Sequence, residues 1–125
     1  MKVIYIARFI AVLILILGII HNIATFTPII QSGLGCVSEG TFNVMMYMSL
    51  ICGTSLILSG LLIIVIVNKL VQYPFLGLLL TIIGVFLCMN GGLAIFYMSG
   101  PSAWAVFLLS IAMFGVILRL RQVVK

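Results

Sequence analysis

The chain has 125 residues, 66% of them hydrophobic, and six Lys and Arg against a single acidic residue give it a net charge of +5 at pH 7. A membrane-spanning helix takes about 20 mostly apolar residues. This length therefore holds four spans with short connections and excludes a separate soluble domain. We expect residues 1–125 to form one integral membrane domain.

The positions of the cations along the chain predict its orientation in the membrane. They lie before or early in the first apolar run, between the second and third runs, and after the fourth: Lys2, Arg8, Lys69, Arg119, Arg121 and Lys125. With four crossings, all of these positions fall on one side, and cytoplasmic segments carry an excess of Lys and Arg. The sequence thus predicts a multi-pass protein of the cell membrane with both termini in the cytoplasm. The basic charge is assigned to orientation and not to nucleic acid.

Four apolar segments follow one another along the chain, and they predict an all-α fold. The expected helices cover about 6–26, 44–67, 72–92 and 102–120. No small-x-small cleavage pattern precedes His21, so the first segment is expected to stay in the protein as a helix.

The connections between these helices are predicted to be short, with one exception. The exception is an outer loop over 27–43, which carries the only acidic residue, Glu39. A connection of a few residues at Lys69 makes the second and third helices an antiparallel hairpin. The third helix is expected to end at Gly92, and Pro101 stands near the first position of the fourth.

Small residues recur every seven positions in each apolar segment, which indicates how the helices pack. They are Ala11, Gly18 and Thr25; Gly53 and Gly60; Gly77, Gly84 and Gly91; Ala105 and Ala112. A seven-residue repeat keeps one stripe facing the neighbouring helices of a left-handed bundle, and small side chains there let the backbones approach closely. The sequence therefore predicts a tight, left-handed four-helix bundle.

His21 is the only histidine and marks the candidate site. It stands three residues after Gly18 and four before Thr25, so these residues share the face that points into the bundle. Ionisable residues inside a membrane are candidates for functional sites. The expected site is a polar pocket open to the extracytoplasmic side, with Ser49 as a further partner of His21 and the following ligand-binding residues: His21, Asn22, Thr25, Glu39, Asn43 and Asn90. Hydrogen bonding between helices is the alternative role for these side chains.

Two other chemistries at this site are less favoured. A histidine oriented by a carboxylate can act as a base, but no Ser or Cys nucleophile stands at an interpretable spacing, so no catalytic residue is assigned. Soft ligands for copper gather toward the outer half: His21, Cys36, Cys88, Met45, Met46, Met48, Met89 and Met98. Their spacing matches no defined ligand motif, so no metal ligand is assigned.

The run Gly18-Ile19-Ile20-His21, followed by Thr25, resembles the first helix of small bacterial four-span membrane proteins that are broadly DoxX-like. The resemblance implies a four-helix fold, and because DoxX-like proteins are associated with membrane redox partners, it implies a quinone or a partner protein. The chain has no flavin, haem or iron–sulfur ligand set of its own. Small multidrug transporters are similar in length, span count and cytoplasmic termini, but they carry a membrane-embedded glutamate in the first helix, where this chain has His21.

These observations predict a non-enzymatic membrane protein whose outer pocket binds a lipid-like or other small ligand or a partner helix. A small transporter that acts as a dimer is one alternative, and a membrane redox or lipid-modifying enzyme subunit is another. A functional dependence on His21 protonation would favour the transporter. The expected partners are membrane lipids and either a second copy or a larger membrane complex, with no nucleic acid.

Overall fold

The computed structural model describes residues 2–32, 35–97 and 100–123, and Met98 and Lys125 lie outside the described residues. The helices are α1 (Lys2–Thr25), α2 (Pro28–Ser32), α3 (Glu39–Lys69), α4 (Leu76–Tyr97) and α5 (Pro101–Val123). All except α2 are long and apolar enough to cross a membrane. The prediction of an all-helical protein with four helices that are long and apolar enough to span a membrane is confirmed, while the handedness of the bundle stays a prediction.

Helix α3 begins at Glu39, earlier than the predicted start near residue 44. Ser38 caps it, because the Ser38 hydroxyl accepts a hydrogen bond from the Thr41 amide at 3.4 Å. Glu39 follows in the first turn, where a negative charge complements the helix dipole. Glu39 and Asn43 therefore belong to a helix and not to the predicted loop.

Helix α4 continues past Gly92, where the sequence predicted its end, as far as Tyr97. Glycine is common inside membrane helices, and Gly91 lets α5 approach, since a Cβ there would lie 3.0 Å from the Phe107 Cα. The chain turns at Gly100, whose φ of +151° suits glycine. Pro101 then opens α5, as predicted.

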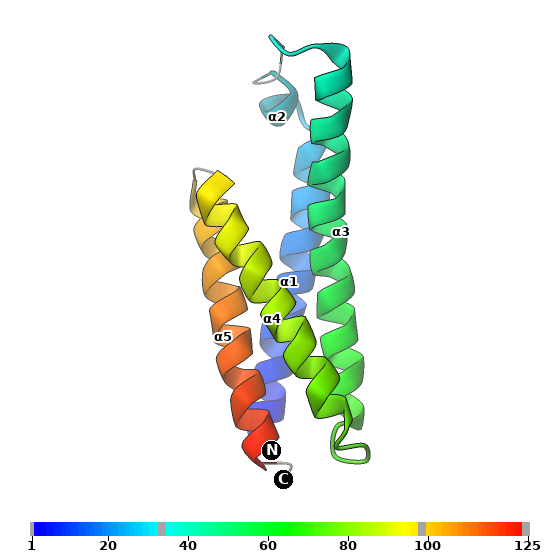
Figure 1. Ribbon diagram of the computed structural model, residues 1–125, viewed down its shortest axis with the longest axis vertical. Coiled ribbons are helices and arrows are strands. Elements are labelled where there is room, and N and C mark those ends of the chain that lie inside the picture. Colours follow the sequence, from blue (N-terminus) through cyan, green and yellow to red (C-terminus); the bar gives the residue numbers. More distant parts are fainter. Residues whose placement is uncertain (1, 33–34, 98–99, 124–125) are drawn as a thin grey trace.

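The four long helices form a ring of contacts in which α1 packs on α3, α3 on α4, α4 on α5, and α5 on α1. Across the ring, no Cα atoms of the described parts of α1 and α4, or of α3 and α5, approach within 8 Å of each other. Figure 1 shows the two chain ends side by side at the lower end, and α3 extending beyond the other helices at the upper end. The contacts of α1 with α3 and of α4 with α5 are the most extensive, so the bundle consists of two helix pairs.

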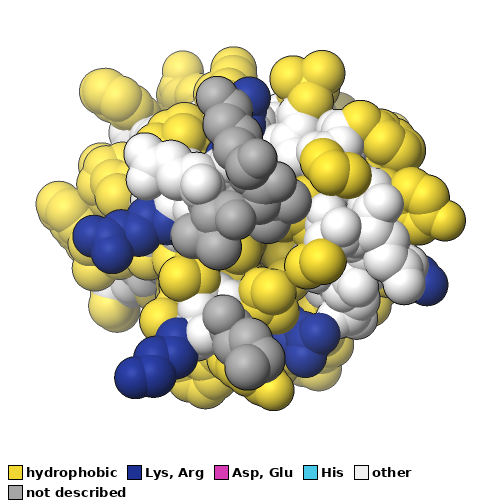
Figure 2. Space-filling view, turned by 90° about the horizontal axis from the view of Figure 1, so that it is seen from below, with side chains coloured by type: hydrophobic (Ala, Val, Ile, Leu, Met, Phe, Trp, Pro, Cys, Tyr) yellow, Lys and Arg dark blue, Asp and Glu magenta, His cyan; other side chains and the backbone are white. Residues whose placement is uncertain are grey.

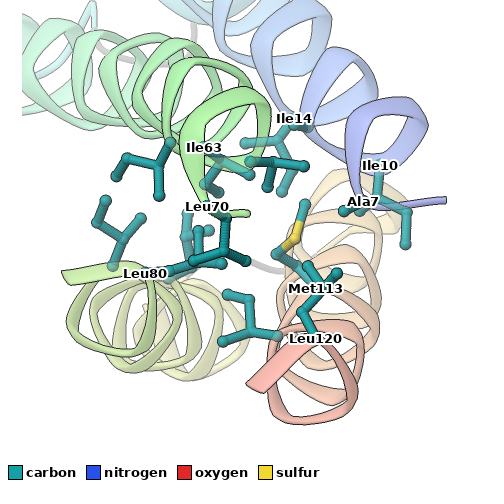
Figure 3. Close-up of a cluster of buried hydrophobic side chains, with 14 of the residues drawn as sticks. Ala7, Ile10, Ile14, Ile63, Leu70, Leu80, Met113 and Leu120 are labelled. Carbon is teal, nitrogen blue, oxygen red and sulfur yellow. The ribbon is translucent and has the colours of Figure 1, made fainter. Parts of the chain in front are cut away.

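The apolar core fills the half of the bundle that contains the chain ends. Figure 3 shows side chains from all four long helices pointing toward one another there, among them Ala7, Ile10, Ile14, Ile63, Leu70, Leu80, Met113 and Leu120. On each long helix, one member of this cluster lies farthest along the helix from the end that carries the chain termini. These residues are Ile14, Leu56, Leu87 and Met113. The core therefore ends near the middle of the bundle, and the outer half is packed differently.

The repeat of small residues is confirmed in α1, α3 and α4, where these residues are buried. At the seam between α1 and α3, a Cβ on Gly18 would lie 2.7 Å from the carbonyl oxygen of Gly53. The prediction is wrong for α5, in which Ala105 is half-buried and Ala112 is exposed. There Ser110 is buried instead, because it lies beside Gly91.

The end of the bundle that carries the chain termini is basic. Figure 2, seen from below, shows Lys and Arg side chains around this end and no acidic side chain on the face in view. Two of the cations are held by neighbours: Arg8 lies 5.7 Å from the centre of the Tyr5 ring, and Arg121 Nη1 donates a hydrogen bond to Thr81 Oγ1 at 3.4 Å. Glu39 begins α3 at the opposite end.

Candidate functional site

Three side chains form a chain of hydrogen bonds between α1 and α3 in the outer half of the bundle. His21 Nε2 lies 3.1 Å from Ser49 Oγ. Ser49 Oγ lies 2.7 Å from Thr25 Oγ1, and Thr25 Oγ1 donates to the backbone carbonyl of His21 at 2.9 Å. The chain thus closes on the residue at which it starts and fixes the histidine ring against α3.

The small-residue seam explains why these groups meet. Gly18 and Gly53 bring the two backbones into contact one to two turns from the polar residues, so even the short side chains of Ser49 and Thr25 reach across the interface. Thr25 is fully buried, and Ser49 and His21 are half-buried. The inward direction that the sequence predicted for His21 and Thr25 agrees with this arrangement.

Asn22 lies on the same interface but bonds a different residue of α3. Its Nδ2 donates to Thr54 Oγ1 at 3.3 Å. Its buried Oδ1 has no hydrogen-bond partner among the described residues and packs directly on Gly53, in the space that a Cβ at that position would take. The contact of Asn22 with α3 is therefore of the kind expected for hydrogen bonding between helices.

A cavity of about 160 Å³ lies beside His21 in the outer half. All four long helices contribute to its wall, which consists of Leu17, Ile20, His21, Ala24, Cys52, Leu56, Ala94, Ser102, Ala103 and Val106. Leu56 belongs both to this wall and to the core, so the cavity begins where the core ends. The described wall residues are mostly apolar, and His21 and Ser102 carry the nitrogen- and oxygen-bearing side chains among them.

The other predicted site residues do not line this cavity. Glu39 and Asn43 are exposed in the first turns of α3. Asn90 Nδ2 donates to the Phe86 carbonyl of its own helix at 3.0 Å. Of the six predicted residues, His21 alone is among the described residues that line the cavity. Thr25 and Asn22 lie beside it at the interface between α1 and α3, and Glu39, Asn43 and Asn90 lie apart from both.

Most of the cavity wall was not predicted from the sequence. Ala94 and Ala103 stand on α4 and α5 at the level of His21, where small side chains leave the space between the helices unfilled. Ala94 is three residues after Gly91, so these two small residues share a face of α4 although Ala94 does not belong to the seven-residue repeat. This spacing is the signal in the sequence that could have pointed to Ala94. Ser102 and Cys52 carry no pattern that sets them apart.

The Ser49 and His21 pair has the spacing of a nucleophile and its base. However, Ser49 does not line the cavity, and its hydroxyl already bonds both Thr25 and His21. Helical amides bond within the helix, so Ser49, in the middle of α3, has no backbone donors beside it for an oxyanion. The geometry is suited to orienting His21 and not to acyl transfer.

The described residues contain no group of three His, Cys, Asp or Glu side chains that could hold a metal ion. Cys36, Cys52 and Cys88 are free thiols, and Cys36 is exposed in the connection before α3. Among the methionines that suggested copper, Met45, Met48 and Met89 are exposed on the bundle surface. These three methionines therefore lie on the outer surface of the bundle and not in its interior.

No family model, curated protein or solved structure matches this chain. The fold and the candidate site together define a multi-pass membrane protein with four candidate spans and an interhelical cavity. The resemblance to DoxX-like proteins stays an expectation from the sequence.

Proposed function

We propose that this protein binds a small lipid-like molecule in the cavity beside His21. The observation that carries the proposal is the cavity itself, which residues from all four long helices line at the point where the core ends. Binding sites for small ligands are mostly apolar, with a few polar groups that orient the ligand. The apolar wall with its single imidazole has this composition.

The volume limits what the cavity holds. An apolar cavity of about 150 Å³ takes up one benzene ring, and the cavity beside His21 has about 160 Å³. It therefore accepts one ring or a short segment of an acyl chain. A larger lipid would place only one end inside and leave the remainder among the lipids around the bundle.

We place the chain termini in the cytoplasm, because the described cations gather at that end of the bundle. The cavity lies in the opposite half and so belongs to the extracytoplasmic leaflet. Lipids of that leaflet are the partners that this position favours.

Native mass spectrometry of the gently extracted protein tests the proposal with two matched variants. The wild-type protein should retain a defined extra mass. Ala94→Phe fills the cavity and should lose that mass, whereas Ala112→Phe adds the same bulk to an exposed position of α5 and should keep it. A wild-type protein without an adduct, or an adduct that survives Ala94→Phe, would contradict the proposal. The same spectra report whether the protein is a dimer, as a transporter of this size requires.

A further inference from the structure

The hydrogen bonds around His21 have only one consistent direction. Thr25 has one hydroxyl hydrogen, and it is donated to the His21 carbonyl at 2.9 Å. Toward Ser49, at 2.7 Å, Thr25 Oγ1 is therefore the acceptor and Ser49 the donor. Since the single Ser49 hydrogen is then used, Ser49 Oγ accepts from His21 Nε2 at 3.1 Å.

This direction assigns the ring hydrogen of His21 to Nε2. A neutral imidazole carries one N–H, so Nδ1 is left with a lone pair that accepts hydrogen bonds. No described residue forms a hydrogen bond with Nδ1, and His21 lines the cavity. The other described residues of the wall, drawn from α1, α3, α4 and α5, include no Lys, Arg, Asp or Glu.

We propose that the cavity selects a neutral molecule with a hydroxyl group on a small apolar body, and that this hydroxyl donates to Nδ1 of His21. The inference rests on the proposed function and adds the chemical class of the ligand. A carboxylate is disfavoured because the described wall residues include no cation to balance its charge. An ether of the same size fits the apolar wall but has no hydrogen to donate.

Benzyl alcohol and anisole test the proposal, because they are isomers of one ring each and only the alcohol donates a hydrogen bond. Cys52 lies in the cavity wall, so occupancy should protect it from a lipophilic maleimide, and exposed Cys36 serves as the reference in the same molecule. We compare the concentrations of the two isomers in the bilayer that half-protect Cys52 from the maleimide. This concentration should be about fivefold to tenfold lower for benzyl alcohol than for anisole, which corresponds to one hydrogen bond.

Variants of Thr25 separate the direction of the hydrogen bonds from simple fit, because Thr25 does not line the cavity. Thr25→Val removes the acceptor for the Ser49 hydroxyl, so Ser49 can donate to Nε2 and Nδ1 loses its role as acceptor. The advantage of benzyl alcohol should fall to about twofold or less. Thr25→Ser keeps the hydroxyl group, so the advantage of benzyl alcohol over anisole should be as large as in the wild-type protein.

The outcomes distinguish this inference from the function on which it rests. Equal protection of Cys52 by both isomers would overturn the hydroxyl preference and leave binding intact. If neither isomer protected Cys52, both the proposed function and this inference would be contradicted. An undiminished preference in Thr25→Val would overturn the direction of the hydrogen bonds.

Nitrogen NMR of the wild-type protein gives an independent reading, since the chain has one histidine. The ring hydrogen is expected on Nε2. A hydrogen found on Nδ1 in the neutral ring would overturn the inference without any substitution.

Discussion

At the scale of single residues, Ser49 is the link on which the polar site depends. Among the described residues, its hydroxyl is the group that joins the fully buried Thr25 to the ring of His21 by hydrogen bonds. Hydrogen bonds between membrane helices contribute on average about 0.6 kcal/mol and at most about 1.7 kcal/mol. Losing Ser49 removes two such bonds and leaves Thr25 Oγ1 without its donor.

We expect Ser49→Ala to lower the free energy of unfolding by about 1–2 kcal/mol, measured by steric trapping in bicelles. Ser55→Ala is the matched control on the same helix, because the Ser55 hydroxyl only donates to the Cys52 carbonyl of its own helix. The control should change the free energy of unfolding by less than about 0.5 kcal/mol. Equal effects of the two substitutions would show that the link between α1 and α3 is not stabilising.

The sequence predicted the inward direction of His21 and Thr25, because three- and four-residue spacings to Gly18 place them on one face. It failed to locate Asn90. A helical Asn satisfies its amide on the carbonyl four residues earlier, as Asn90 does with Phe86, and then needs no partner on another helix. Which of these two solutions an Asn adopts depends on the rotation of its helix in the bundle, and a spacing pattern does not fix that rotation.

At the scale of the elements, the seam between α1 and α3 is a close contact between two helix backbones. A Cβ on Gly60 would lie 2.8 Å from the Ala11 carbonyl oxygen and 2.9 Å from the Leu15 Cβ. Neither neighbour is the flexible end of a long side chain, so the helices must move apart to admit even a methyl group. Tight packing of this kind is what holds helices together in lipid.

Gly60→Ala should therefore cost about 1–3 kcal/mol of the free energy of unfolding, the usual range for overpacking. Gly115→Ala is the control, because it places the same methyl group in the middle of α5, where no described atom of another helix lies within 4 Å. That substitution should be neutral or stabilising by up to about 1 kcal/mol, since alanine favours the helix. The prediction fails if Gly60→Ala is no more destabilising than the control.

The sequence predicted four helices correctly because apolar runs of this length have few other solutions in a membrane. It misplaced the start of α3 and the end of α4. At Ser38, a side-chain cap on the next turn extends the helix into polar sequence. At Gly92, the apolar surroundings keep the backbone hydrogen bonds within the helix, so glycine does not end it as it does in water.

At the scale of the whole molecule, charge and cavity lie at opposite ends. The packed core occupies the basic half with the chain termini, and the cavity occupies the other half. The proposed orientation turns this polarity into a difference between the two leaflets. Anionic headgroups of the cytoplasmic leaflet then face the Lys and Arg side chains.

The proposed orientation predicts which sulfhydryl groups a membrane-impermeant maleimide reaches on intact cells. Cys36, exposed in the connection before α3, should be labelled from outside. In a Lys69→Cys variant, residue 69 at the end of α3 should be labelled only after the membrane is permeabilised. Peptide mapping reads both positions in one molecule, and labelling of residue 69 in intact cells would reverse the orientation.

The unequal lengths of the helices have a consequence for the surrounding bilayer. Helix α3 has 31 residues and α4 has 22, which correspond to about 46 Å and about 33 Å of helix. A bilayer with a hydrocarbon core of about 30 Å matches α4 and leaves the first turns of α3, with Glu39 and Asn43, among the headgroups. This hydrophobic mismatch falls on the same side of the bundle as the cavity. Thickening the bilayer would draw those polar turns toward the hydrocarbon, so membrane thickness acts most strongly on the half of the protein that contains His21.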